Sequence, residues 1–108
     1  MVRPTSEILT DPIVERSASI AKALGHPARI AILKILAEHE KCFCGDITDL
    51  LPLAQSTVSQ HLKALKAAGL ISGDVEGVRT CYCLNPDGIK ELEATLSTLS
   101  AELSKTCC

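Results

Sequence analysis

The stretch at residues 54–69, AQSTVSQHLKALKAAG, constrains the fold of this chain more than any other. On a helix that turns about 100° per residue, one side carries Val58, Leu62, Leu65 and Gly69. The other side is polar, and the stretch holds two lysines and one histidine but no acidic residue. Hydroxyls, amides and lysines on one helix face can contact bases and phosphates in a DNA major groove. The alternative is an amphipathic helix with a solvated polar face.

The 108 residues fit one small domain, and their composition narrows its class. Apolar residues make up 46% but aromatics only 2%, so the core must be built from aliphatic side chains. We expect a cytoplasmic protein without a membrane partner, because no apolar run approaches the roughly 20 residues of a membrane span and no secretory segment opens the chain. The net charge of −2 disfavours nonspecific nucleic-acid binding. It leaves specific binding open, because clustering of basic residues decides that.

Six cysteines occur as three tight pairs. The pairs are Cys42 with Cys44, Cys81 with Cys83, and Cys107 with Cys108. In a cytoplasmic protein such cysteines indicate metal binding or redox activity rather than a disulfide framework. Disulfide geometry disfavours a bond within any one pair, whereas clustered thiolates suit a soft ion.

Turn and capping signals divide the chain into elements. Residues 1–11 are expected to form an N-terminal arm, and Asp11 followed by Pro12 predicts a helix start. That helix is predicted to end at Gly25. His26 and Pro27 open a second helix to about residue 39, which is apolar nearly all round and is therefore expected at the centre of the core.

The middle of the chain predicts a helix-turn-helix followed by a wing. Residues 40–44 read as a connection, residues 46–51 as a short helix stopped by Pro52, and residues 54–69 as the second helix. Strands at 70–75 and 78–84 flank a turn at Glu76 and Gly77. Alternation in the second strand places Tyr82 and Leu84 on one face and the cysteines on the other.

The last helix, opened by Asn85 and Pro86, carries an apolar seam with spacings of 3, 4, 3 and 4 residues. The seam consists of Ile89, Leu92, Leu96, Leu99 and Leu103. It could pack on the chain's own core, but in so small a domain we expect it to form a twofold homodimer. The predicted fold is mainly α with a small β-ribbon, a winged helix-turn-helix in the order α-α-α-α-β-β-α. Its DNA-binding and dimerisation domain spans residues 12–104, and residues 105–108 form a cysteine-bearing tail.

Three motifs in this order carry a family resemblance: ALGHPARI at residues 23–30, LAQSTVSQHLKALKAAGLI at 53–71, and Tyr82-x-Leu84. With them the chain, from about residue 18 to 103, resembles the ArsR/SmtB family of bacterial winged-helix repressors, and most closely its arsenic-responsive members. The resemblance implies a homodimer that binds an inverted repeat in double-stranded operator DNA without a cofactor and releases it when an inducer binds. No enzyme activity is expected, because the chain has neither Cys-x-x-Cys nor a nucleotide-binding loop.

The resemblance makes residues 54–69 the recognition helix. Its DNA-binding candidates, with one from the wing, are Gln55, Ser56, Thr57, Ser59, Gln60, His61, Lys63, Lys66 and Arg79. We assign base contacts to Ser56, Ser59, Gln60 and Lys63, and a backbone contact to Lys66. His61 is either a phosphate contact or a half-buried core histidine. The chain departs from the family pattern at Ala54, which lacks a capping side chain, and at Val78, which displaces the wing arginine to Arg79.

The segment KCFCGDI at residues 41–47 resembles the inducer motif of arsenic-responsive members. Trivalent arsenic or antimony favours three thiolates, but Cys42 and Cys44 supply two, and a third cysteine near Thr48 is missing. We prefer the tail, Cys107 and Cys108, as its source over Cys81 and Cys83. A zinc site on the last helix is not expected, because that helix lacks histidine. Two alternatives to As(III) or Sb(III) stay open: a soft divalent ion (Cd, Pb or Zn), and a redox or persulfide switch.

Overall fold

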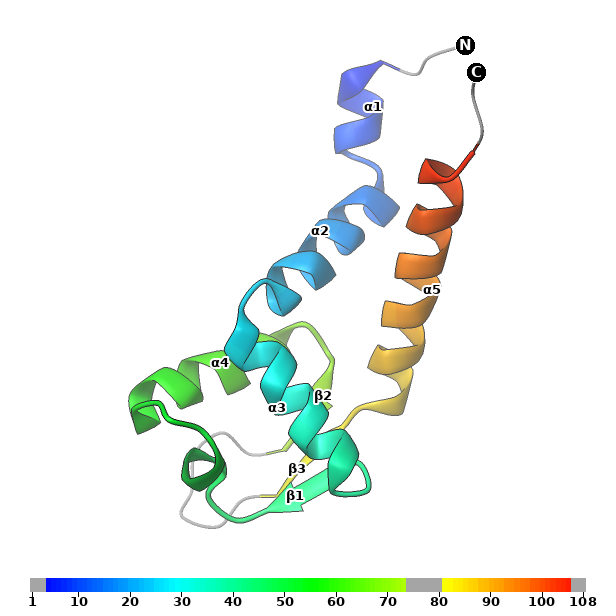
Figure 1. Ribbon diagram of the computed structural model, residues 1–108. Helices are drawn as coiled ribbons and strands as arrows, with labels where there is room; N and C mark the ends of the chain where they lie inside the picture. Colours follow the sequence, from blue (N-terminus) through cyan, green and yellow to red (C-terminus); the bar gives the residue numbers. More distant parts are fainter. Residues whose placement is uncertain (1–3, 74–80, 106–108) are drawn as a thin grey trace.

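The computed structural model describes residues 4–73 and 81–105. It consists mainly of helices, with a small antiparallel sheet at one end, which confirms the predicted fold class (Figure 1). The elements in chain order are α1 (Thr5–Leu9), α2 (Pro12–Leu24), α3 (Pro27–Glu38), β1 (Cys42–Cys44), the 3₁₀ helix η1 (Ile47–Leu50), α4 (Gln55–Ala67), β2 (Ile71–Ser72), β3 (Cys81–Leu84) and α5 (Pro86–Leu103).

The helices begin where the capping signals predicted. The side chains of Asp11, His26, Asp46 and Asn85 each accept a hydrogen bond from the backbone N–H two residues later, at 2.8–3.2 Å. These bonds satisfy N–H groups that a helix leaves without a partner in its first turn. Ala54, at the start of α4, makes no such bond, as its side chain dictates.

The core lies where α3 crosses α4 and the sheet. Ile32 and Leu36 of α3 and Leu65 of α4 are fully buried, together with Leu70 just after α4. The predicted inner face of α4 is confirmed, and α3 is the central helix as expected. Tyr82 is buried from the sheet side, which confirms the predicted alternation in β3.

Three local predictions were wrong or incomplete. Residues 42–44 form strand β1 rather than a connection, because Glu40 and Lys41 adopt left-handed backbone angles (φ 57° and 79°) that reverse the chain after α3. Within the described residues the sheet therefore has three strands, in the order β1-β3-β2. The short helix at 47–50 is 3₁₀ rather than α, and the arm at 1–11 contains the short helix α1.

The end of α4 and the start of α5 lie in close backbone contact. Gly69 has the left-handed φ of 79° that closes a helix. A Cβ atom on Gly88 would lie 1.8 Å from the carbonyl oxygen of Gly69, so only glycine fits there. This contact fixes the point from which α5 leaves the body of the molecule.

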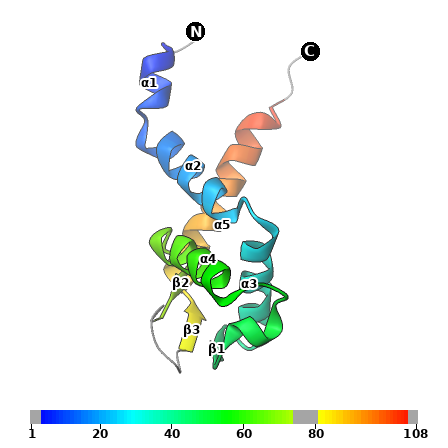
Figure 2. The same cartoon turned by 90° about the vertical axis from the view of Figure 1, so that its left-hand side faces the viewer.

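The molecule is elongated because α1, α2 and α5 project from one end (Figures 1 and 2). Its radius of gyration is 16.5 Å, whereas a compact domain of this length would have about 13 Å. The predicted seam of α5 divides along this projection: Ile89 and Leu92 pack against the core, while Leu96, Leu99 and Leu103 are exposed. No helix among the described residues is long and apolar enough to cross a membrane.

Candidate DNA-binding face and cysteine cluster

The outer face of α4 presents the polar residues that the sequence assigned to DNA. Gln55, Ser56, Gln60 and Lys63 are exposed, and so is Lys66 at the edge of the face. Thr57 and Ser59 are partly exposed. The helix is held by its apolar inner face, so these side chains are free to meet a ligand without disturbing the core.

His61 lies on the inner side of α4, with 7% of its surface exposed. Its Nδ1 accepts a hydrogen bond from Arg29 Nε at 3.1 Å, and its ring lies 4.3 Å from that of His26. Burial lowers the pKa of His61, and the nearby His26 and Arg29 lower it further. Of the two roles proposed for His61, this environment favours the core histidine, which stays neutral.

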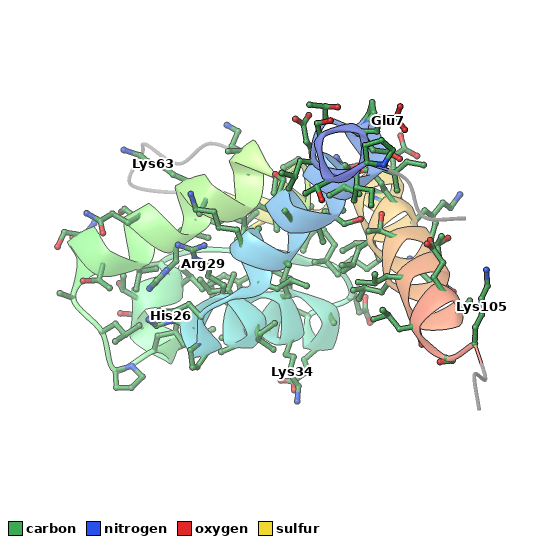
Figure 3. The ribbon with its side chains drawn as sticks, turned by 90° about the horizontal axis from the view of Figure 1, so that it is seen from above. Glu7, His26, Arg29, Lys34, Lys63 and Lys105 are labelled. Atoms are coloured by element: carbon green, nitrogen blue, oxygen red, sulfur yellow. A yellow bond between two sulfur atoms is a disulfide. The ribbon has the colours of Figure 1, made fainter. Side chains whose placement is uncertain are left out.

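Arg29 joins three helices and was not recognised as structural from the sequence. Besides its bond to His61 on α4, its Nη1 donates to the carbonyl oxygen of Lys22 on α2 at 3.0 Å. Arg29 and Lys63 lie toward the same side of the molecule when it is seen from above (Figure 3). The family-like segment His26 to Arg29 thus fixes the recognition helix against α2 and α3.

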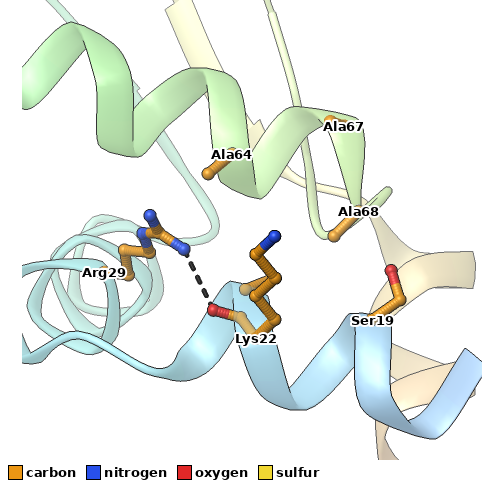
Figure 4. Close-up of a pocket in the computed structure, with 7 residues that line it drawn as sticks. Ser19, Lys22, Arg29, Ala64, Ala67 and Ala68 are labelled. Carbon is orange, nitrogen blue, oxygen red and sulfur yellow. Dashed lines mark hydrogen bonds between the residues drawn. The ribbon is translucent and has the colours of Figure 1, made fainter.

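A shallow pocket of about 280 Å³ lies between α2, α3 and α4 (Figure 4). Its lining residues are Ser19, Lys22, Ala23, Arg29, Ala64, Ala67 and Ala68. Lys22 and Arg29 bring positive charge to the flank of α4, and small alanines leave the pocket open (Figure 4). Neither cation was among the residues predicted from the sequence, because they lie on other helices and become neighbours of α4 only in the fold.

A second arginine anchors the far end of α4. Arg16 Nη2 donates to the carbonyl oxygen of Ala68 at 2.8 Å, and its Nε pairs with Glu91 on α5. One side chain of α2 therefore connects the end of the recognition helix to the projecting helix α5. No periodic pattern predicts this contact, because the partners are distant along the chain.

Four cysteines meet on one face of the sheet. Strands β1 and β3 are antiparallel, with Cys42 opposite Cys83 and Cys44 opposite Cys81. Both pairs have Cα atoms 4.0 Å apart and are linked as disulfides. Cys42, Cys44 and Cys81 are exposed and Cys83 is half-buried, while Phe43 and Tyr82, between the pairs, point toward the core. We call these four residues the cysteine cluster.

The cluster brings together two cysteine pairs that were assigned different priority as inducer ligands, Cys42 with Cys44 and Cys81 with Cys83. Cys42 and Cys44 find sulfur partners on β3, at Cys81 and Cys83. Cys107 and Cys108, the preferred partners, lie outside the described residues, as does Arg79. The strand that makes the cluster was missed because three residues, two of them exposed, carry too little periodicity to be recognised.

Comparisons with known proteins place the chain in a family. Residues 26–72 match the model of "bacterial regulatory protein, arsR family". An HTH-type transcriptional regulator of Methanocaldococcus jannaschii, MJ1325, is 43% identical over 79 residues, which are 72% of this chain and 88% of that protein. The chain belongs to the ArsR family.

Further matches agree with this assignment. The arsenical resistance operon repressor of Bacillus subtilis is 36% identical over 87 residues, covering 81% of this chain and 74% of that protein. The crystal structure of Rv0081 from Mycobacterium tuberculosis superposes with a TM-score of 0.58 at 31% identity, covering 88% of this chain and 96% of that one. ArsR-family proteins are DNA-binding transcriptional regulators rather than enzymes. The family match includes Cys42 and Cys44 but ends before Cys81 and Cys83.

Proposed function

We propose that this ArsR-family protein is a homodimeric repressor that releases its operator when a thiophilic inducer, As(III) or Sb(III), binds thiolates of the cysteine cluster. One observation carries the proposal: β1 and β3 place four cysteine sulfurs on one face of a sheet that continues directly into the helix-turn-helix. The likeness to the arsenical resistance operon repressor of B. subtilis supports the choice of inducer.

The outer face of α4 is the surface that reads the operator. Ser56, Ser59, Gln60 and Lys63 offer hydroxyl, amide and ammonium groups to base edges. Lys66 contacts phosphate at the edge of the face, and Lys22 and Arg29 add positive charge on its other flank. The protein is acidic overall, so this local clustering, rather than net charge, draws it to DNA.

The projecting helices α2 and α5 form the dimer surface. Together they expose Ile13 (65%), Leu96 (46%), Leu99 (42%) and Leu103 (75%), an apolar set that a lone chain would leave in water. A groove of about 140 Å³ lined by residues of both helices runs between them. A twofold dimer through this surface buries the apolar set and presents two copies of α4 to an inverted repeat.

When reduced, the cluster adds two candidate sulfur ligands to the Cys42–Cys44 motif. A trivalent arsenic or antimony ion takes three soft thiolate ligands, and β3 supplies up to two beside the two of β1. Coordination requires thiolates, so binding releases protons and strengthens as the pH rises. The second candidate, a soft divalent ion such as Cd(II), is favoured by the count of four sulfurs, which a tetrahedral site would use in full.

Inducer binding at the cluster can act on α4 through η1. Only Gly45 and Asp46 separate Cys44 from η1, and Ile47 of η1 is buried in the core with α4. Asp46 caps η1, and hydrogen bonds from the side chain and backbone N–H of Thr48 lower its pKa. A displacement of Cys44 on inducer binding would therefore move η1 and α4 together. A coupling of about 1–3 kcal/mol between inducer and DNA would account for regulation of this kind.

The test is an operator-release titration on reduced protein, followed by fluorescence anisotropy of labelled DNA. Arsenite should release DNA from the wild type but not from Cys42→Ser/Cys44→Ser, which retains DNA binding but keeps only the two cluster sulfurs of β3. Single Cys81→Ser and Cys83→Ser variants separate the two candidates: a three-thiolate inducer tolerates the loss of one sulfur, whereas a four-thiolate ion does not. Arsenite release that is unchanged in Cys42→Ser/Cys44→Ser would refute the proposed site.

A further inference from the structure

The cysteine cluster consists of two cross-strand pairs at matched register positions. Cys42–Cys83 and Cys44–Cys81 are each directly opposite in the antiparallel ladder, and each pair is bonded through sulfur. Their Cα separation of 4.0 Å is nearer to the roughly 4.5 Å of the closely spaced type of antiparallel pair than to the roughly 5.5 Å of the other type, and in the closely spaced type the side chains stand nearest each other. The strands thus hold each sulfur against one specific partner.

We propose that this cluster is a thiol–disulfide site that decides whether the protein can receive its inducer. In the reduced state four thiols are available to a thiophilic ion. In the oxidised state the two cross-strand disulfides consume all four, and the ion finds no thiolate ligand. The part of this inference that concerns the inducer rests on the proposed function, whereas the pairing of the cysteines does not.

The location of the cluster allows it to change state without unfolding the protein. None of the four cysteines belongs to the hydrophobic core. Cys42, Cys44 and Cys81 are exposed, so a small oxidant can reach a sulfur of each pair. Tyr82 lies on the opposite face of β3 from the sulfurs and is buried in the core.

The chemistry balances with a small-molecule disulfide as oxidant. The thiolate of Cys42 attacks one sulfur of that disulfide, forms a mixed disulfide and expels one thiolate. The thiolate of Cys83 then attacks the Cys42 sulfur and expels the second thiolate. Two protein thiols are oxidised and one external disulfide is reduced to two thiols, with the two protons taken by solvent or by the departing thiolates. Cys44 and Cys81 react in the same way.

Oxidation would also lock the DNA-binding module within closed loops. The Cys42–Cys83 bond spans a sequence separation of 41 residues and the Cys44–Cys81 bond one of 37. Both loops contain η1, α4 and β2. In the oxidised state both bridges hold β1 against β3, at the strand that leads into η1. The same bonds therefore consume the thiolate ligands and constrain the strand next to η1.

Peptide mapping tests the pairing in the full-length chain. After equilibration with oxidised glutathione, alkylation and trypsin digestion, peptides 42–63 and 80–90 should be found linked. Cys42→Ser/Cys83→Ser keeps the opposite pair Cys44–Cys81 and should retain the link. The matched control Cys42→Ser/Cys81→Ser keeps only the diagonal pair and should lose it. No link in the wild type, or equal linking in both variants, would overturn the inference.

Arsenite binding to oxidised and reduced wild type tests the gating. The oxidised protein should bind arsenite at least about tenfold more weakly than the reduced protein. Treatment with dithiothreitol, which is removed before the measurement, should restore arsenite binding. Equal binding by the oxidised form would overturn the gating. Failure of the proposed function has a different signature: the reduced protein binds arsenite and yet keeps its operator, while the disulfide link and its redox dependence are unaffected.

Discussion

Strand β1 precedes helix α4 in the chain and strand β3 follows it, yet the helix and the β1–β3 pair are held in place by different forces. Val58, Leu62 and Leu65 fix α4 through burial in the core. The cysteine cluster lies outside the core and is positioned by strand register and by sulfur bonds. The contrast means that α4, the DNA-binding output, is part of the hydrophobic core. The cysteine cluster, the inducer-binding input, can change its chemical state while the core stays folded.

The inner face of α4 should give the largest stability effect. Leu65 is fully buried, so Leu65→Ala should lower the free energy of unfolding by about 2–5 kcal/mol through lost burial and a residual cavity. The neighbouring exposed Lys66→Ala should change it by no more than about 0.5 kcal/mol. Urea denaturation measures both. Equal losses for the two variants would contradict the assignment of the inner face.

Oxidation of the cluster should stabilise the protein by a comparable amount. Loops of about 40 residues closed by a disulfide contribute on the order of 4 kcal/mol by restricting the unfolded chain. Reduction should therefore lower the urea midpoint of the wild type at fixed protein concentration.

A variant with one bridge sharpens that comparison. Cys42→Ser/Cys83→Ser retains the Cys44–Cys81 bond and should keep most of the oxidised stability, because the second bridge closes only a short extra loop. Coincident unfolding curves for oxidised and reduced wild type would show that the sulfurs do not join in solution.

The same contrast explains which features the sequence could predict. The inner face of α4, the helix caps and the core helix α3 follow from periodicity and from local capping chemistry, so they were predicted correctly. Strand β1 and its pairing with β3 depend on a chain reversal at Glu40 and Lys41 and on contacts about 40 residues apart. Neither is visible in local pattern, so the pairing of Cys42 and Cys44 with Cys83 and Cys81 was not predicted.

The contacts of Arg16 and Arg29 belong to the same class. Each arginine donates a hydrogen bond to a residue of α4 or its end that is distant in sequence, Arg16 to Ala68 and Arg29 to His61. The residues around each arginine in the sequence do not predict that partner. The burial of His61 depends on Arg29 and His26, so a residue on the border of the helix faces could be placed only in the fold.

On the outer face of α4, base readout and phosphate contact should be separable. Gln60→Ala should cost about 1–3 kcal/mol on the operator and relax base preference, because an amide lost from a base edge leaves that base unread. Lys66→Ala should weaken binding to operator and random DNA alike and reduce the salt dependence. Anisotropy titrations on both DNAs decide this, and a uniform loss for Gln60→Ala would remove it from base readout.

The smallest expected effect is a pH dependence from His61. Its pKa lies below the ordinary 6.5, chiefly because burial disfavours the charged ring. The unfolded chain therefore binds the proton more readily, and the contribution to stability is complete above pH 6.5 and declines as the pH falls from there toward the pKa of the folded state. His61→Gln should flatten this slope in thermal unfolding, whereas the exposed His39→Gln should leave it intact. An unchanged slope in His61→Gln would assign it to other groups.

The division between input and output is tested most directly by arsenite titration of reduced protein bound to operator DNA. Wild type and Cys44→Ser/Cys81→Ser, which lacks one sulfur from each strand, should bind the operator with similar affinity. Arsenite should release only the wild type, because the variant keeps α4 and its core intact but retains too few thiolates for a three-sulfur site. If the variant releases DNA at the same arsenite concentration as the wild type, the cluster is not the input and the account is contradicted.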